Sequence, residues 1–223
     1  MPVPDPPRRA GSAVSPVAAV HQVETVIEDW LTVRRYTLDL RGSDGTTRRL
    51  TRLSVGRGDR VAVVLRDPAR GTVILTRQFR LPVLIHSGSN GSSDGSLIEV
   101  PGGLTDGSGI QDAVVREAEE ETGYRAGNLV ELATVYSAPQ LSSERVSLFA
   151  AEYSADDRVG PGGGVAAEGE DIEVFEIPLA EAIERLLQEP AADAKTLLLL
   201  LLAQYRESSD PIGSPRKQTS QNH

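Results

Sequence analysis

Alternating apolar and polar positions begin near residue 33. Tyr36, Leu38 and Leu40 fall at every second residue, and the turn residues "GSDG" separate them from a second run of similar character. Alternation at period two is typical of a strand with one buried face, and a short turn between two such runs predicts a hairpin. We therefore predict a small antiparallel unit over residues 33–55.

Further along the chain, apolar residues gather in short runs bounded by Gly, Pro and Asp. Such runs are typical of strands that are buried on both faces. The order of strands, helix, strands and helices predicts an α/β fold (an α+β sandwich), with a mixed sheet between helices. The expected strands are 59–67, 71–80, 96–103, 129–138, 144–153 and 172–178, and the expected helices are 109–122, 179–188 and 194–206.

The chain is expected to divide into four parts. Residues 1–22 are rich in Pro, Ala and Ser, and residues 208–223 are similar, so both are expected to be disordered tails. Between them we expect an N-terminal β unit at 23–57 and the main domain at 58–207. Two Gly-rich stretches, "SGSNGSSDG" and "GPGGGVAAEGED", are expected to be loops of the main domain.

Composition narrows the possible functions. The 223 residues carry a net charge of −9, so most of the surface should repel nucleic acid and anionic membranes. The chain has no cysteine, which excludes disulfides, thiolate metal sites and cysteine nucleophiles. The apolar run from Leu197 to Ala203 is too short to span a bilayer, and the N-terminus lacks a secretory signal pattern. We expect a cytoplasmic protein with no nucleic-acid or membrane partner.

The acidic stretch "REAEEETGY", residues 116–124, requires an explanation. On a helix, Glu120 and Glu121 lie within about 60° of Glu117, whereas Glu119 lies on the opposite side. Three carboxylates on one face, beside an apolar stripe, repel one another, and Arg116 neutralises only one charge. A hard divalent cation such as Mg²⁺ prefers oxygen ligands and would neutralise the face. The alternative is an ordinary solvated helix.

The segment "PGGLTDGSGIQDAVVREAEEETGY" resembles the Nudix box, G-x5-E-x7-R-E-U-x-E-E-x-G-U. The second half of the box matches at every fixed position. The first half departs from it, because Ser108 stands where the box has a glutamate, and either Gly102 or Gly103 serves as the box glycine. Ser108 and Gln111 form a capping-box pattern, so Ser108 is expected to cap the helix.

Similarity extends over roughly residues 30–205 to the ADP-ribose and GDP-mannose-type branch of nucleoside-diphosphate-sugar pyrophosphatases. This resemblance implies hydrolysis of a diphosphate bridge, with Mg²⁺ (or Mn²⁺) as the cofactor and a nucleoside diphosphate sugar as the substrate. It also implies a homodimer that exchanges N-terminal strands. The implied metal ligands are Gly102 (through its carbonyl), Glu117, Glu120 and Glu121, of which Glu120 and Glu121 are also catalytic.

The resemblance implies further site residues outside the box. A glutamate on the second Gly-rich loop is expected to be the catalytic base, namely Glu168, with Glu170 as the competing candidate. Independently of the resemblance, Arg77 and Arg80 lie near the end of an expected strand and are expected to bind the phosphates of the substrate, since arginine binds phosphate through paired hydrogen bonds, with Arg80 favoured. Glu99 is expected to reach the sugar of the substrate or the metal. Each of these residues could instead be an ordinary surface charge.

Three other functions are compatible with parts of the sequence. One is a non-catalytic Nudix module that senses a nucleotide, although the intact acidic face argues against it. Another is hydrolysis of a different diphosphate, such as a dinucleoside polyphosphate, coenzyme A or a capped RNA. The third is a structural Ca²⁺-binding protein, but no EF-hand loop pattern is present.

Overall fold

The computed structural model describes residues 17–87, 93–105, 107 and 109–209. The chain divides into two compact units. The first contains residues up to Arg57 together with Ala138–Ser143, and the second contains Gly58–Ser137 and the chain from Glu144 onward. Each unit has its own sheet.

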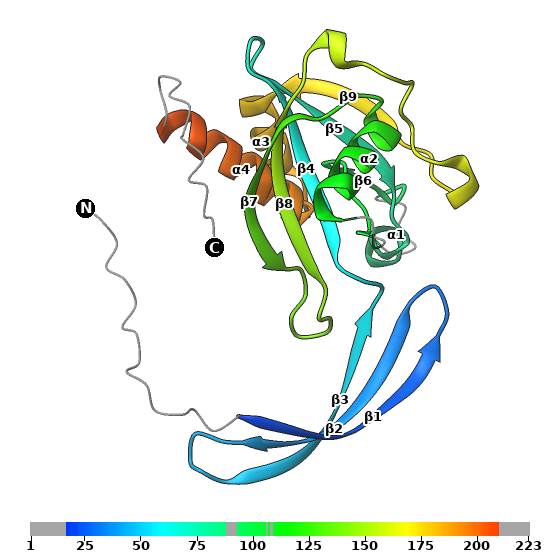
Figure 1. The fold of residues 1–223 in the computed structure, drawn as a ribbon, viewed down its shortest axis with the longest axis vertical. Helices are drawn as coiled ribbons and strands as arrows, with labels where there is room; N and C mark the ends of the chain where they lie inside the picture. Colours follow the sequence, from blue (N-terminus) through cyan, green and yellow to red (C-terminus); the bar gives the residue numbers. More distant parts are fainter. Residues whose placement is uncertain (1–16, 88–92, 106, 108, 210–223) are drawn as a thin grey trace, which may run out of the picture. The chain divides into compact units, whose positions relative to one another are not determined.

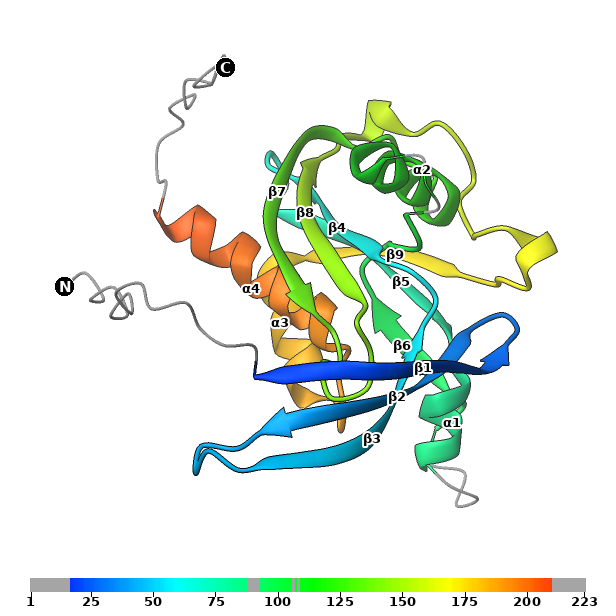
Figure 2. The same ribbon diagram turned by 60° about the horizontal axis from the view of Figure 1, so that its bottom comes forward.

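The first unit is a three-stranded antiparallel sheet in the order β1-β2-β3 (Figure 2). Its strands are β1 (Ala18–Glu28), β2 (Thr32–Arg41) and β3 (Thr47–Gly56). Strands β2 and β3 form the expected hairpin, in which Asp44 accepts hydrogen bonds from the backbone and side chain of Thr46. Leu141, from the second segment of the unit, accepts the N–H of Val55 at 3.0 Å.

Strand β1 corrects the prediction of a tail through residue 22. The strand begins at Ala18, inside the segment that we expected to be disordered. Register shifts between Val20 and Gln22 and between Thr25 and Ile27 break the alternation of the side chains, which hid the strand from a period-two search. The tail segments 1–16 and 210–223 lie outside the described residues.

The second unit is built on a six-stranded mixed sheet (Figure 1). Strand β4 pairs with β8 in parallel and with β5 in antiparallel orientation, and β5 also pairs with β6 and β9. The path through the sheet is β6-β5-β4-β8-β7, with β9 beside β5. The strands are β4 (Arg60–Asp67), β5 (Thr72–Phe79), β6 (Ser96–Glu99), β7 (Gly127–Tyr136), β8 (Arg145–Glu152) and β9 (Glu173–Pro178).

Helices cover both faces of this sheet (Figure 1). Helix α2 (Ile110–Thr122) packs on one core cluster, and α3 (Leu179–Gln188) and α4 (Ala194–Ser209) pack on the other. Successive residues of β4 alternate between the clusters, with Ala62 and Val64 facing α3 and α4. Burial on both faces is the reason that the run "VAVVL" is continuously apolar.

The predicted fold class is confirmed, and each expected strand and helix of the main domain is present, although β6 already ends at Glu99. The sequence did not predict α1 (Leu81–Ser87), a short helix directly after β5. Much of the Gly/Ser loop expected after it, residues 88–92, lies outside the described residues. The leucine run of α4 is only half buried: Leu199 and Leu200 are inaccessible, whereas Leu198 and Leu201 are partly exposed.

Candidate active site

Two glutamates of α2 are buried against the sheet. Glu117 is 9% exposed and Glu121 is 3% exposed, one turn apart on the helix face that meets the core. The same face carries the apolar residues Ala113, Val114 and Ala118, so packing of this stripe draws both carboxylates inward. Glu119 is on the other side, where it pairs with Arg125 at 3.1 Å. Glu117 and Glu121 therefore share one face of the helix and Glu119 lies on another, as expected.

The turn after β6 brings backbone against these carboxylates. The N–H of Gly102 donates to Glu121 Oε2 at 3.2 Å, and a Cβ on Gly103 would lie 2.3 Å from the Glu117 carboxylate. A Cβ on Gly102 would lie 2.3 Å from the carbonyl oxygen of Val61. A side chain at either position would prevent this close approach. The structure therefore requires glycine at both Gly102 and Gly103, the two candidates for the box glycine.

The electrostatic environment disfavours charge on both buried acids. Burial, followed by the nearby Glu117, raises the pKa of Glu121 to about 8. Burial also raises the pKa of Glu117, although Arg116 beside it acts in the opposite direction. A bound cation would reverse both shifts by stabilising the ionised carboxylates. Without such a cation, the two buried acids therefore favour their protonated form.

Arg116 engages the outer part of the acidic face. Its guanidinium lies 3.0 Å from Glu117 Oε1 and 3.2 Å from Glu120 Oε2, and it donates to the carbonyl of Leu104. Among the described residues, no three His, Cys, Asp or Glu side chains are arranged to hold a metal ion. The oxygen donors that fit a divalent cation are Glu117, Glu121 and the backbone of Gly102, with Glu120 at the exposed margin.

The second Gly-rich loop packs against the C-terminal end of α2. Gly163 donates its N–H to the carbonyl of Glu121 at 2.9 Å, and Gly164 donates to that of Glu120 at 3.0 Å. A Cβ on Gly162, which has a φ of 70°, would lie 2.5 Å from the backbone of Thr122. These glycines permit close packing and satisfy carbonyls at the helix end, a role that the sequence analysis did not anticipate.

The two glutamates of this loop, Glu168 and Glu170, have different surroundings in the structure. Glu168 is exposed in a short 3₁₀ turn (Ala166–Glu168). Glu170 is partly buried, accepts the N–H of Val165 at 2.9 Å, and contributes to the raised pKa of Glu117 and Glu121. Glu170, and not the favoured Glu168, is therefore brought to the acidic pair.

The two arginines expected to bind substrate, Arg77 and Arg80, also differ in their partners. Arg80 donates to Glu99 Oε2 at 2.6 Å, and Glu99 is almost fully buried. Arg77 instead pairs with Glu173 at 2.9 Å on the adjacent strand β9. Arg77 lies within β5 and faces its neighbour β9, whereas Arg80 follows the last residue of β5, Phe79, at the start of α1.

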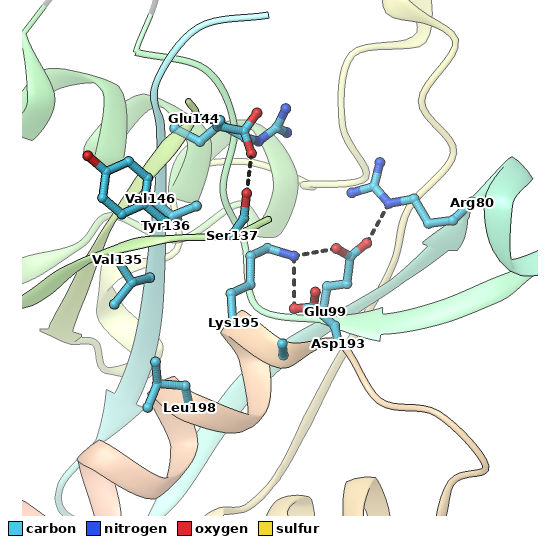
Figure 3. Close-up of a pocket in the computed structure, with 12 residues that line it drawn as sticks. Arg80, Glu99, Val135, Tyr136, Ser137, Glu144, Val146, Asp193, Lys195 and Leu198 are labelled. Atoms are coloured by element: carbon cyan, nitrogen blue, oxygen red, sulfur yellow. Dashed lines mark hydrogen bonds and ion pairs between the residues drawn. The ribbon is translucent and has the colours of Figure 1, made fainter. Parts of the chain in front are cut away.

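A pocket of about 480 Å³ opens beside Glu99 (Figure 3). Lys195, which the sequence analysis missed, binds both Glu99 and Asp193, so that four charges form a chain from Arg80 to Asp193. The signal for Asp193 was available, since an Asp before an apolar helical run is a typical N-cap. The pocket is lined by Arg60, Arg80, Glu99, Val135, Tyr136, Ser137, Glu144, Val146, Asp193, Ala194, Lys195 and Leu198.

Glu99 connects this pocket with the acidic pair. Its charge contributes to the raised pKa of Glu121, so the two groups of charges are close enough to interact.

No helix in the described part of the chain has both the length and the apolar character needed to cross a membrane. A mixed sheet between helices, a buried acidic pair on one helix and a double-glycine turn against it define a protein of the Nudix fold class.

Comparison with known proteins agrees with this class. The NUDIX domain model matches residues 56–200. A GDP-mannose pyrophosphatase from Pectobacterium atrosepticum is 40% identical over 186 residues, which cover 83% of this chain and 93% of the relative. A protein of the same name from Yersinia enterocolitica is 38% identical over 181 residues, or 81% of this chain and 92% of the relative. The chain belongs to the NUDIX family, as the box residues led us to expect.

A solved structure supports the fold independently. The crystal structure of an ADP compounds hydrolase superposes with a TM-score of 0.63, covering 89% of this chain and 98% of the other. The two sequences are 24% identical, so this similarity is evidence for the shared fold alone.

Proposed function

We propose that the protein hydrolyses the diphosphate bridge of a nucleoside diphosphate sugar, releasing a nucleoside monophosphate and a sugar phosphate. The observation that carries this proposal is the buried pair Glu117 and Glu121 beside the backbone of Gly102. Two relatives with the name GDP-mannose pyrophosphatase, 40% and 38% identical over most of the chain, favour GDP-mannose as the first substrate to test.

Glu117, Glu121 and the Gly102 carbonyl would hold a divalent cation, for which we propose Mg²⁺ with Mn²⁺ as a substitute. Glu120 would complete the set by turning from Arg116 toward the cation. The bound cation would lower the pKa of the attacking water and screen the charge that develops on the diphosphate. The chain's part in this chemistry is to hold the carboxylates and the Gly102 backbone in place, while the cation would keep the carboxylates ionised.

A carboxylate of the Gly-rich loop would accept the proton of the attacking water. We propose Glu170 for this role in place of Glu168, because Glu170 is close enough for its charge to act on the acidic pair and is oriented by the N–H of Val165. General bases require this kind of fixed orientation near the reacting atoms. Glu168 remains the competing candidate if the loop rearranges when substrate binds.

The pocket beside Glu99 would bind the substrate. Arg80 and Lys195 supply positive charge for phosphate oxygens, and Glu99 and Asp193 can accept hydrogen bonds from sugar hydroxyls. The apolar wall formed by Val135, Val146 and Leu198 suits the less polar faces of a sugar or base. Arg77 would have no direct part, since it pairs with Glu173.

Substrate profiling tests the proposal. Purified protein is assayed with GDP-mannose, ADP-ribose and a diadenosine polyphosphate, each with Mg²⁺, with Mn²⁺ and with a chelator. We expect cation-dependent release of a nucleoside monophosphate from one of the two nucleoside diphosphate sugars. Preferred cleavage of the diadenosine compound would assign a different diphosphate substrate. Tight binding without turnover would indicate a sensor module.

A further inference from the structure

The hydroxyl of Thr196 joins the first turn of α4 to the end of β6. The N–H of Val100 donates to Thr196 Oγ1 at 2.9 Å, and Oγ1 donates to Asp193 Oδ2 at 2.6 Å. Thr196 has no exposed surface, so water does not compete for either hydrogen bond. The hydroxyl thus links a helix on one face of the sheet to the strand that leads into the acidic site.

Asp193 fixes the orientation of that hydroxyl. Its Oδ2 also accepts the backbone N–H of Thr196 at 2.9 Å and the ammonium of Lys195 at 2.9 Å. An aspartate that binds the N–H three residues later caps the N-terminus of a helix. The Thr196 proton is therefore directed to Asp193, which leaves a lone pair of Oγ1 directed at Val100.

The segment after Val100 is held at several further points. The carbonyl of Pro101 accepts the N–H of Val63 at 3.0 Å, and the carbonyl of Gly103 accepts that of Val61 at 2.9 Å. Gly102 lies between these contacts, against the backbone of β4, with its N–H on Glu121. The segment is therefore held by β4 at Pro101 and Gly103 and by α4 at Val100, which is two residues before Gly102.

We propose that Thr196 is a positioning residue for the active site: its hydroxyl, oriented by Asp193, holds Val100 and thereby sets the Gly102 backbone relative to Glu121. This inference rests on the proposed function, in which Gly102 and Glu121 share a divalent cation. Valine has nearly the shape of threonine but no hydroxyl, so Thr196→Val would leave the buried N–H of Val100 without an acceptor. The strand end would then shift to find one.

The test compares three variants in the metal-free and Mn²⁺-bound protein. In Thr196→Val, we expect amide hydrogen exchange at Val100 and Gly102 to accelerate at least about tenfold and the Kd for Mn²⁺ to rise about 10- to 100-fold, the range typical of groups that orient metal ligands. Thr196→Ser, which keeps the hydroxyl, should restore both values. Leu199→Val alters the buried core of the same helix and should lower Tm without weakening Mn²⁺ binding.

Wild-type Mn²⁺ affinity in Thr196→Val would overturn the inference, as would an equal loss in Leu199→Val. If the valine variant does not fold, Thr196→Cys carries the same comparison, because a thiol has similar volume and is a weak acceptor. A wild-type protein that binds no Mn²⁺ and hydrolyses no nucleoside diphosphate sugar refutes the proposed function. The exchange rates at Val100 and Gly102 in the metal-free protein still decide whether Thr196 fixes the strand end.

Discussion

At the scale of single residues, Glu117 and Glu121 oppose folding in their ionised form. Both carboxylates are buried beside each other, and Gly102 supplies Glu121 with one N–H. Burial dominates the raised pKa of each acid. An ionised pair in this position is stable when a cation compensates the charge, which is the physical basis of the proposed metal dependence.

This arrangement predicts how the stability of the metal-free protein depends on pH. The pKa of Glu121 is about 8 in the folded state against an ordinary value of 4.5, so the folded state retains a proton that the unfolded state loses. The resulting stabilisation is present below about pH 4.5 and is lost as the pH rises to about 8, by on the order of 4 kcal/mol.

Denaturant unfolding between pH 5 and 8 measures this loss. In Glu121→Gln, which cannot ionise, the fall in the free energy of unfolding over this range should be markedly smaller. Saturating Mg²⁺ should likewise reduce it in the wild type. Identical pH profiles for wild type and variant, without metal, would contradict the assignment of the raised pKa to Glu121.

A second prediction at this scale concerns turnover. Glu121→Gln should reduce kcat by at least about 100-fold while the fold persists, because it removes a ligand charge and almost no volume. Glu119→Gln is the matched control on the same helix and should change kcat less than twofold, since Glu119 lies away from the acidic pair and forms an ion pair with the exposed Arg125. Steady-state assays at saturating Mg²⁺ measure kcat for both variants. A similar loss of kcat in both would refute the prediction that Glu117, Glu120 and Glu121 form the functional face of the helix.

At the scale of elements, helix α2 and the Gly-rich loop after β8 pack together through backbone hydrogen bonds. The N–H groups of Gly163 and Gly164 bind carbonyls in the last turn of the helix, and Gly123 ends the helix in the left-handed conformation. The loop then returns to place Glu170 near the acidic pair. The position of a loop carboxylate is thus determined by the end of the helix that carries the proposed ligands.

This assembly predicts different effects for the two loop glutamates. Glu170→Gln should lower kcat at least about tenfold at saturating Mg²⁺, while calorimetry shows substrate binding nearly unchanged, because the amide oxygen can still accept the N–H of Val165 but cannot take a proton. Glu168→Gln should alter kcat less than twofold. The reverse ranking would return the base to Glu168, through a loop rearrangement on binding.

At the scale of the whole molecule, the three-stranded sheet of the first unit exposes several apolar side chains. Every residue of β1 is exposed, including Val20, Val23 and Ile27, and Leu53 of β3 is also exposed. A sheet of this size is marginally stable unless one face is covered. We propose that a second copy of the chain covers it, in the exchanged-strand homodimer that the family resemblance implies.

Sedimentation equilibrium at micromolar concentration tests the assembly. We expect about twice the chain mass of 23.8 kDa for the wild type. Val23→Asp places a charge on the apolar surface and should shift the mass toward one chain, whereas Glu24→Gln, its neighbour on β1, should leave the dimer intact. A stable monomer with full activity in the wild type would contradict the exchanged-strand assembly.

The sequence by itself determined the strands and the three longer helices of the main domain and the acidic face of α2. Continuous apolar runs specify strands that are buried on both faces, and the spacing of Glu117, Glu120 and Glu121 places them together on any helix. Both features follow from the spacing of residues within a single stretch of the chain, so no information on distant residues is needed. Strand β1 escaped the same reasoning because two register shifts interrupt its periodicity.

Only the tertiary structure decided which separated residues meet. Nothing in the local sequence distinguishes Glu170 from Glu168, or assigns Lys195 and Thr196 to a strand end almost 100 positions earlier. Those contacts depend on how α4 and the Gly-rich loop pack against the sheet, which sums many weak interactions over the whole core. The chemistry of the box is a local property of the chain, whereas the surroundings that orient it are a property of the fold.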